Sequence, residues 1–221
     1  MSQELWAKVD DYINRITIAP DAALDATSAS AVAAGLPPIS VTPAHGKLLH
    51  LIARAQGAKR ILEVGTLAGY STIWLARAVP ADGRVITLEA NAMHADIARA
   101  NIERAGLADR VDIRLGAALE TLPQLAAEKQ PPFDFTFIDA DRTHLAEYFD
   151  WGIRLSRPGS VIIVDNVVRK GGVIDAASED VNVKGVRRFN DRLETDTRVS
   201  ATMVQTVGAK GYDGFAMALV L

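Results

Sequence analysis

A carboxylate, two glycines and a hydroxyl stand close together after an apolar run in the stretch Ile61–Ser71. Glu63 comes just before Gly65, and three residues separate Gly65 from Gly69. A dinucleotide-binding turn has the spacing G-x-G-x-x-G after its strand. The G-x-x-x-G spacing behind a carboxylate suits the methionine end of S-adenosylmethionine better than a pyrophosphate. On this motif alone, a plain strand-to-helix turn is an equal alternative.

Further acidic side chains follow the apolar runs downstream. Glu89 ends the second run, Asp139 and Asp141 follow the fourth, and Asp165 and Asn166 follow the fifth. In an open parallel sheet, ligands bind beyond the carboxyl ends of the strands, so we expect these side chains to converge on one edge. Repulsion among so many carboxylates must be offset by positive charge.

The residues near the glycine turn have plausible roles toward a nucleoside cofactor. Glu89 lies roughly twenty residues beyond the turn, where an acidic side chain can accept both ribose hydroxyls. Ser71 and the backbone N–H groups near Gly69 open a helix, which suits the carboxylate of a methionine moiety. The alternatives are a solvated charge at a strand end for Glu89 and a simple helix cap for Ser71.

A second set of residues has the chemistry of a metal site. Asp139, Asp165 and Asn166 offer oxygen ligands without cysteine or histidine, which suits Mg²⁺, Mn²⁺ or Ca²⁺. Two carboxylates and an amide leave coordination positions open for water or substrate, as a catalytic Mg²⁺ prefers. The alternative is that the aspartates only cap the turns that follow them.

Composition limits the class of protein. A chain of 221 residues fits one α/β domain. It has a net charge of −3 and no cluster of Lys and Arg, which argues against a nucleic-acid partner. The absence of cysteine excludes disulfides, zinc-thiolate sites and thiol chemistry. The apolar runs are strand-sized, and the acidic amino terminus is unlike a signal peptide. We therefore expect a cytoplasmic protein without a membrane partner.

The pattern of apolar residues predicts the elements that carry these groups. Residues 5–16 have helical spacing behind Ser2, a second helix covers 21–34, and a third begins at Thr42-Pro43 and ends at Gly57. Strands then alternate with helices, one of which covers 92–105 and closes at Gly106. This alternation predicts a parallel sheet covered on both faces. The strands are expected at 60–64, 84–89, 111–115, 133–138 and 160–164.

The end of the chain departs from this alternation. After a helix around 183–196, strands at 199–206 and 214–220 are separated only by a glycine-rich segment at 208–211. Strands this close in sequence pair as an antiparallel hairpin. We expect a single domain over residues 1–221, with a helical extension at 1–58 and a sheet core at 59–221.

The chain resembles the small, metal-dependent class I O-methyltransferases, the family of the caffeoyl-CoA and catechol enzymes, and in particular its bacterial branch. The resemblance covers nearly the whole chain in the right order. It rests on the stretches 63–71, 137–141, 157–159, 164–168 and 208–221, the last including Gly-Tyr-Asp-Gly at 211–214.

The resemblance implies a Rossmann-like, doubly wound sheet of seven strands, mostly parallel, with an antiparallel C-terminal strand. The implied reaction transfers a methyl group from S-adenosylmethionine to one hydroxyl of a vicinal dihydroxy aromatic, assisted by Mg²⁺ (or Mn²⁺ or Ca²⁺). Family members are commonly dimers, so a homodimer to which the amino-terminal helices contribute is expected. The implied metal ligands are Asp139, Asp165 and Asn166. The implied cofactor pocket comprises Val41, Glu63, Gly65, Ser71, Glu89, Ala118, Asp139 and Asp141.

One departure from the family concerns catalysis, for which the resemblance implies Asp139, Asp165, Asn166 and the residue at position 142. The family usually has there a lysine that is proposed to take the phenol proton, whereas this chain has Arg142. A guanidinium stays protonated and cannot act as a base, although it can stabilise developing negative charge. The proton would then pass to water.

Two rival functions stay open at this point. The first is an NAD(P)-dependent oxidoreductase on a similar sheet, which the missing G-x-G-x-x-G disfavours. The second is a cofactor-binding relative that has lost catalysis, with Arg142 as a symptom of the loss.

Overall fold

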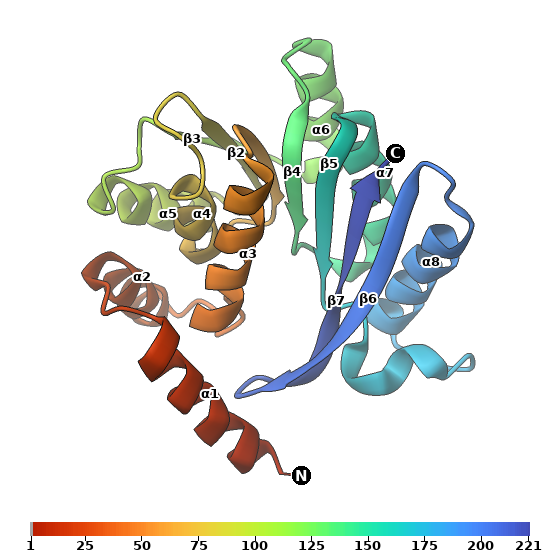
Figure 1. Cartoon of the computed structure of the whole chain (residues 1–221), viewed down its shortest axis with the longest axis horizontal. Coiled ribbons are helices and arrows are strands. Elements are labelled where there is room, and N and C mark those ends of the chain that lie inside the picture. The colour runs from red at the N-terminus through yellow and green to blue at the C-terminus, as the bar shows by residue number, and fades with distance from the viewer. Residues whose placement is uncertain (1) are drawn as a thin grey trace. The chain divides into compact units, whose positions relative to one another are not determined.

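The structure is a computed structural model that describes residues 2–221. Its seven strands form one sheet with the order β3-β2-β1-β4-β5-β7-β6, and helices alternate with the first five strands (Figure 1). This confirms the Rossmann-like fold class. The chain divides into two compact units, one made of Ile13–Pro131 and the other of Pro132–Leu221 together with the residues up to Tyr12. The single-domain description with a boundary at 58/59 stays a prediction.

The unit Ile13–Pro131 contains three parallel strands with registers Arg60↔Arg84 and Val85↔Val111. The strands β1 and β2 are almost entirely buried because helices pack on them. The strands are β1 (Arg60–Val64), β2 (Arg84–Glu89) and β3 (Val111–Leu115), and the helices are α2 (Ala22–Ala33), α3 (Pro43–Gln56), α4 (Tyr70–Ala76), α5 (Ala92–Arg104) and α6 (Ala118–Ala127).

Helix ends in this unit follow from local chemistry. Thr42 caps α3 by accepting a hydrogen bond from the backbone N–H of His45 at 3.2 Å, and Pro43 takes the first helical position. Gly57 ends the helix in the left-handed region at φ 70°. These predicted boundaries are confirmed. Asp21 and Asn91 cap α2 and α5 through their carboxylate and amide oxygens.

The other unit is built around β4 (Phe133–Ile138) and β5 (Ser156–Asp165), which are parallel. The last strand of the chain, β7 (Gly211–Val220), runs antiparallel to β5 and also to β6 (Val199–Gly208). The predicted hairpin is therefore confirmed, with its second strand next to β5. This unit also contains α7 (Leu145–Arg154), α8 (Val181–Thr195), the 3₁₀ helices η1 (Arg142–His144) and η2 (Arg169–Ile174), and most of α1 (Gln3–Thr17).

Three strands of this unit are longer than predicted. The strand β5 begins at Ser156 rather than 160, because partners shift from Phe133↔Ser156 to Phe135↔Val161 across a bulge. Pro158-Gly159 has the sequence of a turn, yet the hydroxyl of Ser160 ties this segment to Phe133 O at 2.8 Å. The strands β6 and β7 pair as far as Gly208↔Gly211, so the hairpin turn contains only Ala209 and Lys210.

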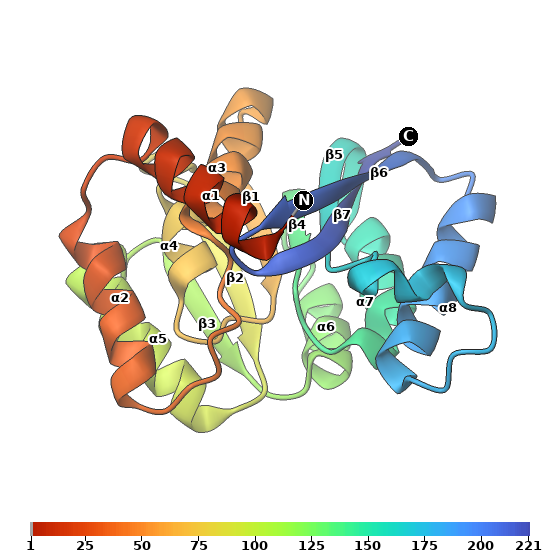
Figure 2. The same cartoon turned by 90° about the horizontal axis from the view of Figure 1, so that it is seen from below.

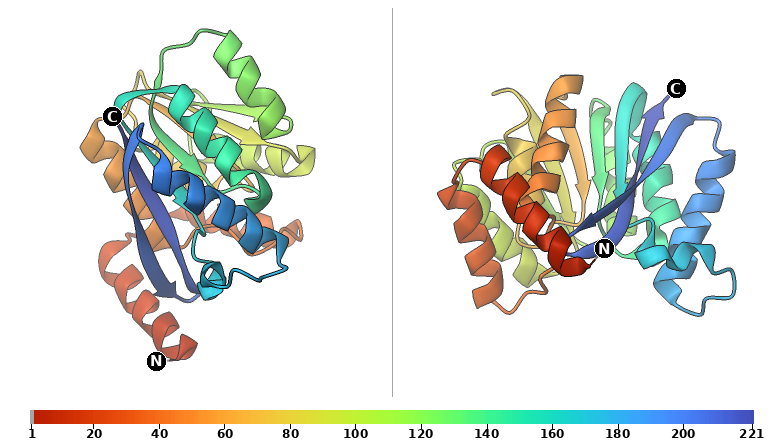
Figure 3. Two further views of the ribbon diagram at one scale, coloured as in Figure 1. Left: turned by 90° about the vertical axis from the view of Figure 1, so that its right-hand side faces the viewer. Right: turned by 60° about the horizontal axis from the view of Figure 1, so that its bottom comes forward.

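The β6–β7 hairpin extends past the end of β5. Asp165, the last residue of β5, is paired with Phe215, so Gly211–Gly214 lie beyond it. They pair with β6, and Gly214 O also accepts a hydrogen bond from Val167 N–H at 3.0 Å. Figures 1 and 3 show the two long strands continuing to a turn that meets α1. There, Ala209 N–H donates to Asp10 Oδ2 at 2.7 Å and Gln3 Nε2 donates to Ala209 O at 3.0 Å.

None of the described helices combines the length and the apolar character that crossing a lipid bilayer requires.

The close packing of α8 against η1 can be tested by a substitution at Gly185. A Cβ on Gly185 of α8 would lie 2.1 Å from the carbonyl oxygen of Arg142. We expect Gly185→Ala to push η1 away from α8 and to lower the free energy of unfolding in urea by about 1–3 kcal/mol. Gly152→Ala on α7 is the control, because its nearest contact would be an ordinary 3.4 Å. Equal stability of the two variants would contradict this packing argument.

Candidate functional site

The carboxylate of Glu63 is buried in a network of hydroxyls. Its side chain has 0 % exposure. Ser71 Oγ donates to Oε1 at 2.6 Å, while Thr72 Oγ1 and Thr87 Oγ1 donate to Oε2 at 2.5 and 2.7 Å. The carboxylate thus ties the end of β1 to the first turn of α4 and to β2. The Ser71 hydroxyl is used in this network, and α4 has no side-chain cap.

The chain between β1 and α4 forms a turn that glycine favours. Gly65 has φ 100° and Gly69 has φ 85°, and Leu67 between them also has a positive φ of 51°. Residues with a side chain rarely adopt these angles. Glycine is therefore favoured at both positions, and at Gly69 the turn also packs on α5, where a Cβ would meet Ala98 at 3.4 Å.

Glu89 lies directly beside this turn. Its Oε2 accepts hydrogen bonds from the backbone N–H of Thr66 at 3.2 Å and of Leu67 at 2.8 Å, and its Oε1 accepts from Asn91 N–H at 3.0 Å. The residue is 9 % exposed, so it is not the solvated strand-end charge that the sequence left open. His94 Nδ1 lies 3.4 Å from Oε1.

The structure therefore brings Glu63, Gly65, Ser71 and Glu89 together around one turn. Val41 is buried directly before α3, and Ala118 is the first residue of α6. Both are apolar, and their place in a cofactor pocket stays a prediction.

The second set of predicted residues gathers at the carboxyl ends of β4 and β5. The pairing Ile138↔Val164 places Asp139 and Asp165 on adjacent strand ends. Arg142 Nη2 donates to Asp139 Oδ1 at 3.0 Å and also to Asn166 Oδ1. Asn166 adopts φ 60°, and its N–H donates to Asp165 Oδ1 at 2.9 Å. The oxygens of Asp139 and Asn166 thus surround a single cationic nitrogen, and Asp165 lies beside them.

The electrostatics of this cluster favour a bound cation. Asp165 is 8 % exposed, and burial together with the nearby charge of Asp139 raises its pKa to about 8. A divalent cation would stabilise both carboxylates in their ionised form. Within residues 2–221 no three His, Cys, Asp or Glu side chains form a metal-binding group. A metal here would therefore use Asn166 and water besides the two carboxylates, a hard oxygen set that fits Mg²⁺, Mn²⁺ or Ca²⁺.

Asp141 belongs to the same segment but makes different contacts. Its carboxylate caps η1 at His144 N–H (3.2 Å) and accepts hydrogen bonds from the hydroxyls of Thr143 (2.6 Å) and Tyr148. Burial raises the pKa of Asp141, but these hydrogen bonds outweigh burial and hold it below its usual value. Its predicted part in cofactor binding stays a prediction.

Sequence reasoning from the residues alone missed Asp213. Its Oδ1 accepts hydrogen bonds from the backbone N–H groups of Val168 at 3.0 Å and Arg169 at 2.9 Å, and Arg169 Nη1 lies 3.7 Å from Oδ2. These contacts hold the segment after Asn166, in which Arg169 and Lys170 also have positive φ. The only signal in the sequence was an aspartate directly before Gly214 and two positions after Gly211.

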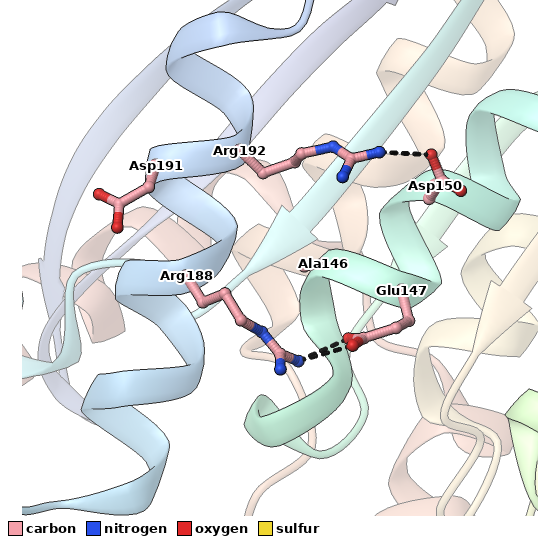
Figure 4. A pocket seen from close by; sticks show the side chains of 6 residues that line it. All are labelled: Ala146, Glu147, Asp150, Arg188, Asp191 and Arg192. Carbon is pink, nitrogen blue, oxygen red and sulfur yellow. Dashed lines mark hydrogen bonds and ion pairs between the residues drawn. The ribbon is translucent and has the colours of Figure 1, made fainter.

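A surface hollow of about 400 Å³ lies between α7 and α8 (Figure 4). Its charged side chains are paired across the two helices, since Arg188 bonds Glu147 at 2.6 Å and Arg192 bonds Asp150 at 3.1 Å. None of the predicted site residues lines it. It is lined by Ala146, Glu147, Asp150, Arg188, Asp191 and Arg192.

Comparison with known proteins identifies the family. The family model described as O-methyltransferase matches residues 21–219. The chain belongs to the O-methyltransferase family. Among its relatives, a catechol O-methyltransferase of Niastella koreensis is 52 % identical over 220 residues, which is 100 % of each chain.

Solved structures of similar proteins identify the methyl donor. An O-methyltransferase from Bacillus cereus in complex with SAH is 55 % identical, with a TM-score of 0.98 and 100 % of both chains covered. The O-methyltransferase TomG from Streptomyces achromogenes, in complex with SAM, is 47 % identical, with a TM-score of 0.96 over 100 % of this chain and 99 % of that one. This O-methyltransferase is therefore an S-adenosylmethionine-dependent enzyme, which sets the oxidoreductase alternative aside.

The raised pKa of Asp165 can be tested through the pH dependence of the free energy of unfolding. Between about pH 4, the usual range of an aspartate, and pH 8, the folded protein holds a proton on Asp165 that the unfolded chain has lost. The contribution of Asp165 to stability must therefore fall as pH rises through this window. We expect the free energy of unfolding in urea and chelator to fall more between about pH 5 and about pH 8 in the wild type than in Asp165→Asn. Asp82→Asn, at an exposed site, is the control, and parallel profiles of wild type and Asp165→Asn would refute the shift.

Proposed function

We propose that the enzyme methylates one hydroxyl of a catechol-type aromatic with the help of a divalent metal. The observation that carries this proposal is the convergence of Asp139, Asp165 and Asn166, two carboxylates and an amide, on a cationic centre. Two adjacent hydroxyls and such an oxygen set are matching ligands for one hard metal ion. The name of the Niastella koreensis relative supports the same acceptor class.

The proposed cofactor contacts centre on the glycine turn. Glu89, at the end of β2, would accept hydrogen bonds from the ribose hydroxyls, and the turn Gly65–Gly69 would face the methionine part. Glu63 would act indirectly, since its side chain is fully buried and its oxygens are used by three hydroxyls of α4 and β2, whereas Glu89 keeps 9 % exposure. Val41, Ala118, Ser71, Asp139 and Asp141 complete the proposed pocket.

The proposed mechanism assigns separate tasks to the residues of the cluster. Asp139, Asp165 and Asn166 would hold the metal, which when bound lowers the pKa of the acceptor hydroxyl. Arg142 carries a guanidinium, which cannot act as a base, and would stabilise negative charge on the acceptor oxygen. This oxygen attacks the sulfonium methyl group in line. Because the methyl donor is already activated, most of the catalysis would come from positioning and charge stabilisation.

The deciding experiment is methyl transfer from labelled S-adenosylmethionine to catechol or caffeic acid, with Mg²⁺ and with EDTA. We expect product only with metal, and at least a ~100-fold lower rate in Asp165→Ala, because a buried metal ligand is lost. Asp82→Ala is the matched control, and circular dichroism checks that Asp165→Ala stays folded.

Full activity of Asp165→Ala in excess chelator would refute the metal role. Tight S-adenosylmethionine binding by the wild type without turnover of any catechol would instead indicate another acceptor, or a relative that has lost catalysis.

The proposed assembly is a homodimer through α1. No residue of α1 is buried, and one side of the helix carries Leu5, Val9, Tyr12 and Ile16, which are 46–56 % exposed. Such an apolar stripe is typical of a surface that another chain covers. The proposed location is the cytoplasm, the default for a chain of this composition.

The dimer is tested by molar mass in solution. We expect light scattering to give twice the chain mass for the wild type and the single mass for the double variant Leu5→Glu, Val9→Glu, because two charges cannot stay in a desolvated interface. Lys8→Gln on the polar side of α1 is the control. A wild type that is monomeric at all concentrations would overturn the proposed dimer.

A further inference from the structure

The turn of the β6–β7 hairpin places one lysine beyond the carboxyl end of β5. Only Ala209 and Lys210 lie between the paired glycines Gly208 and Gly211. Because β5 ends at Asp165, opposite Phe215, the last four residues before Phe215 project past the strand that carries a proposed metal ligand. Lys210 therefore lies in a projecting hairpin turn (residues 208–211) at the same edge of the sheet as Asp139 and Asp165.

The helix α1 holds this hairpin turn in place. Both backbone polar groups of Ala209 are bound, the N–H by Asp10 and the carbonyl by the side-chain amide of Gln3. The contact is close, since a Cβ on Gly208 would lie 2.5 Å from Asp10 Oδ2. Figure 2 shows α1 running past this turn. The backbone next to Lys210 is thus fixed while its side chain stays available.

Lys210 is exposed at the tip of the hairpin, yet partial burial of its ammonium group disfavours the charged form. Burial lowers the pKa of Lys210, and the negative charges of Asp139 and Asp165 oppose this shift without cancelling it. The charged groups on the elements around it include Glu4, Lys8, Asp10 and Asp11 of α1, Asp213 of β7 and Arg142 of η1. Within the described residues, Lys210 has no ion pair or hydrogen bond, whereas Arg142 is bound to Asp139 and Asn166.

We propose that Lys210 is the base that takes the proton from the acceptor hydroxyl, a task that Arg142 cannot perform. This inference rests on the proposed function. The neutral Nζ accepts the proton as the O–H bond breaks and the oxygen forms a bond to the methyl carbon. The carbon–sulfur bond breaks, its electron pair stays on the sulfur of S-adenosylhomocysteine, and the ammonium then releases its proton to water. An amine with a lowered pKa is suited to this role near neutral pH.

The experiment compares two acceptors that differ in acidity. Catechol needs a base at neutral pH, whereas a nitrocatechol is already largely ionised. We expect Lys210→Met to lower kcat with catechol about 10²–10⁴-fold, the usual contribution of a general base, and to lower kcat with nitrocatechol far less. Raising the pH or adding a small primary amine should partly restore the catechol reaction. Lys210→Arg places a long basic side chain that cannot lose its proton at the same position, and it should stay impaired with catechol.

Binding measurements separate this role from a structural one. Calorimetry should show Mg²⁺ and S-adenosylmethionine binding in Lys210→Met no weaker than in the wild type, since Lys210 holds neither. Lys184→Met is the control, because Lys184 is paired with Glu179 at 2.7 Å on the surface of α8. Its kinetics should match the wild type with both acceptors.

Three outcomes would overturn the assignment of Lys210 alone. In the first, Lys210→Met methylates catechol as fast as an active wild type. In the second, Lys210→Met loses activity equally with catechol and nitrocatechol. In the third, Lys210→Arg is fully active with catechol. A wild type that methylates neither catechol nor nitrocatechol would overturn the proposed function itself, and the base with it.

Discussion

The repulsion between two carboxylates at neighbouring strand ends organises the unit that contains β4 and β5. Parallel pairing of these strands puts Asp139 and Asp165 side by side, and burial keeps water from screening them. A proton on Asp165 relieves this repulsion, and keeping both carboxylates ionised requires positive charge from elsewhere in the chain or from a bound ion. Arg142 supplies part of it from the 3₁₀ turn after β4. Packing α8 against η1 through Gly185, with no side chain between them, keeps that turn in place.

Glu63 shows how a buried carboxylate is stabilised without any ion. Three hydroxyls from α4 and β2 donate to its two oxygens. These donors are neutral, local and part of the fold, so the carboxylate serves to brace the glycine turn. Asp165 is buried to a similar degree, but its neighbour Asp139 adds a like charge. The partners of a buried acid, and not its burial, separate a structural role from a ligand role.

The parts of the fold that the sequence predicted well are those set by local chemistry. The ends of β1, β2, β3 and β4 were correct because each apolar run is bounded by polar or turn-forming residues. The start of β5 was missed because Pro158-Gly159 has the composition of a turn. Tertiary contacts keep this segment in the sheet, among them Ser160 with Phe133 O and Arg157 with Asp134. For the site, the strand-end rule found the acidic residues. It could not show that Ser71 donates to Glu63, or that Asp213 accepts from the backbone after β5, because these contacts depend on tertiary pairing. For the same reason it did not place the turn with Lys210 beyond the end of β5.

The helix α1 has two surfaces that the proposed function requires. One contacts the turn of the β6–β7 hairpin, and the other is the apolar stripe proposed to bind a second subunit. At about 100° per residue, Gln3 and Asp10 fall on one side of the helix, where they hold the hairpin turn. The apolar stripe that begins at Leu5 and Val9 is centred roughly 140° away and is exposed. The same helix can therefore bind the turn and a second subunit at once. An isolated helix of 15 residues is marginal in water, so a subunit covering the stripe would also order the turn that carries Lys210. In this arrangement, assembly and proton transfer depend on one element.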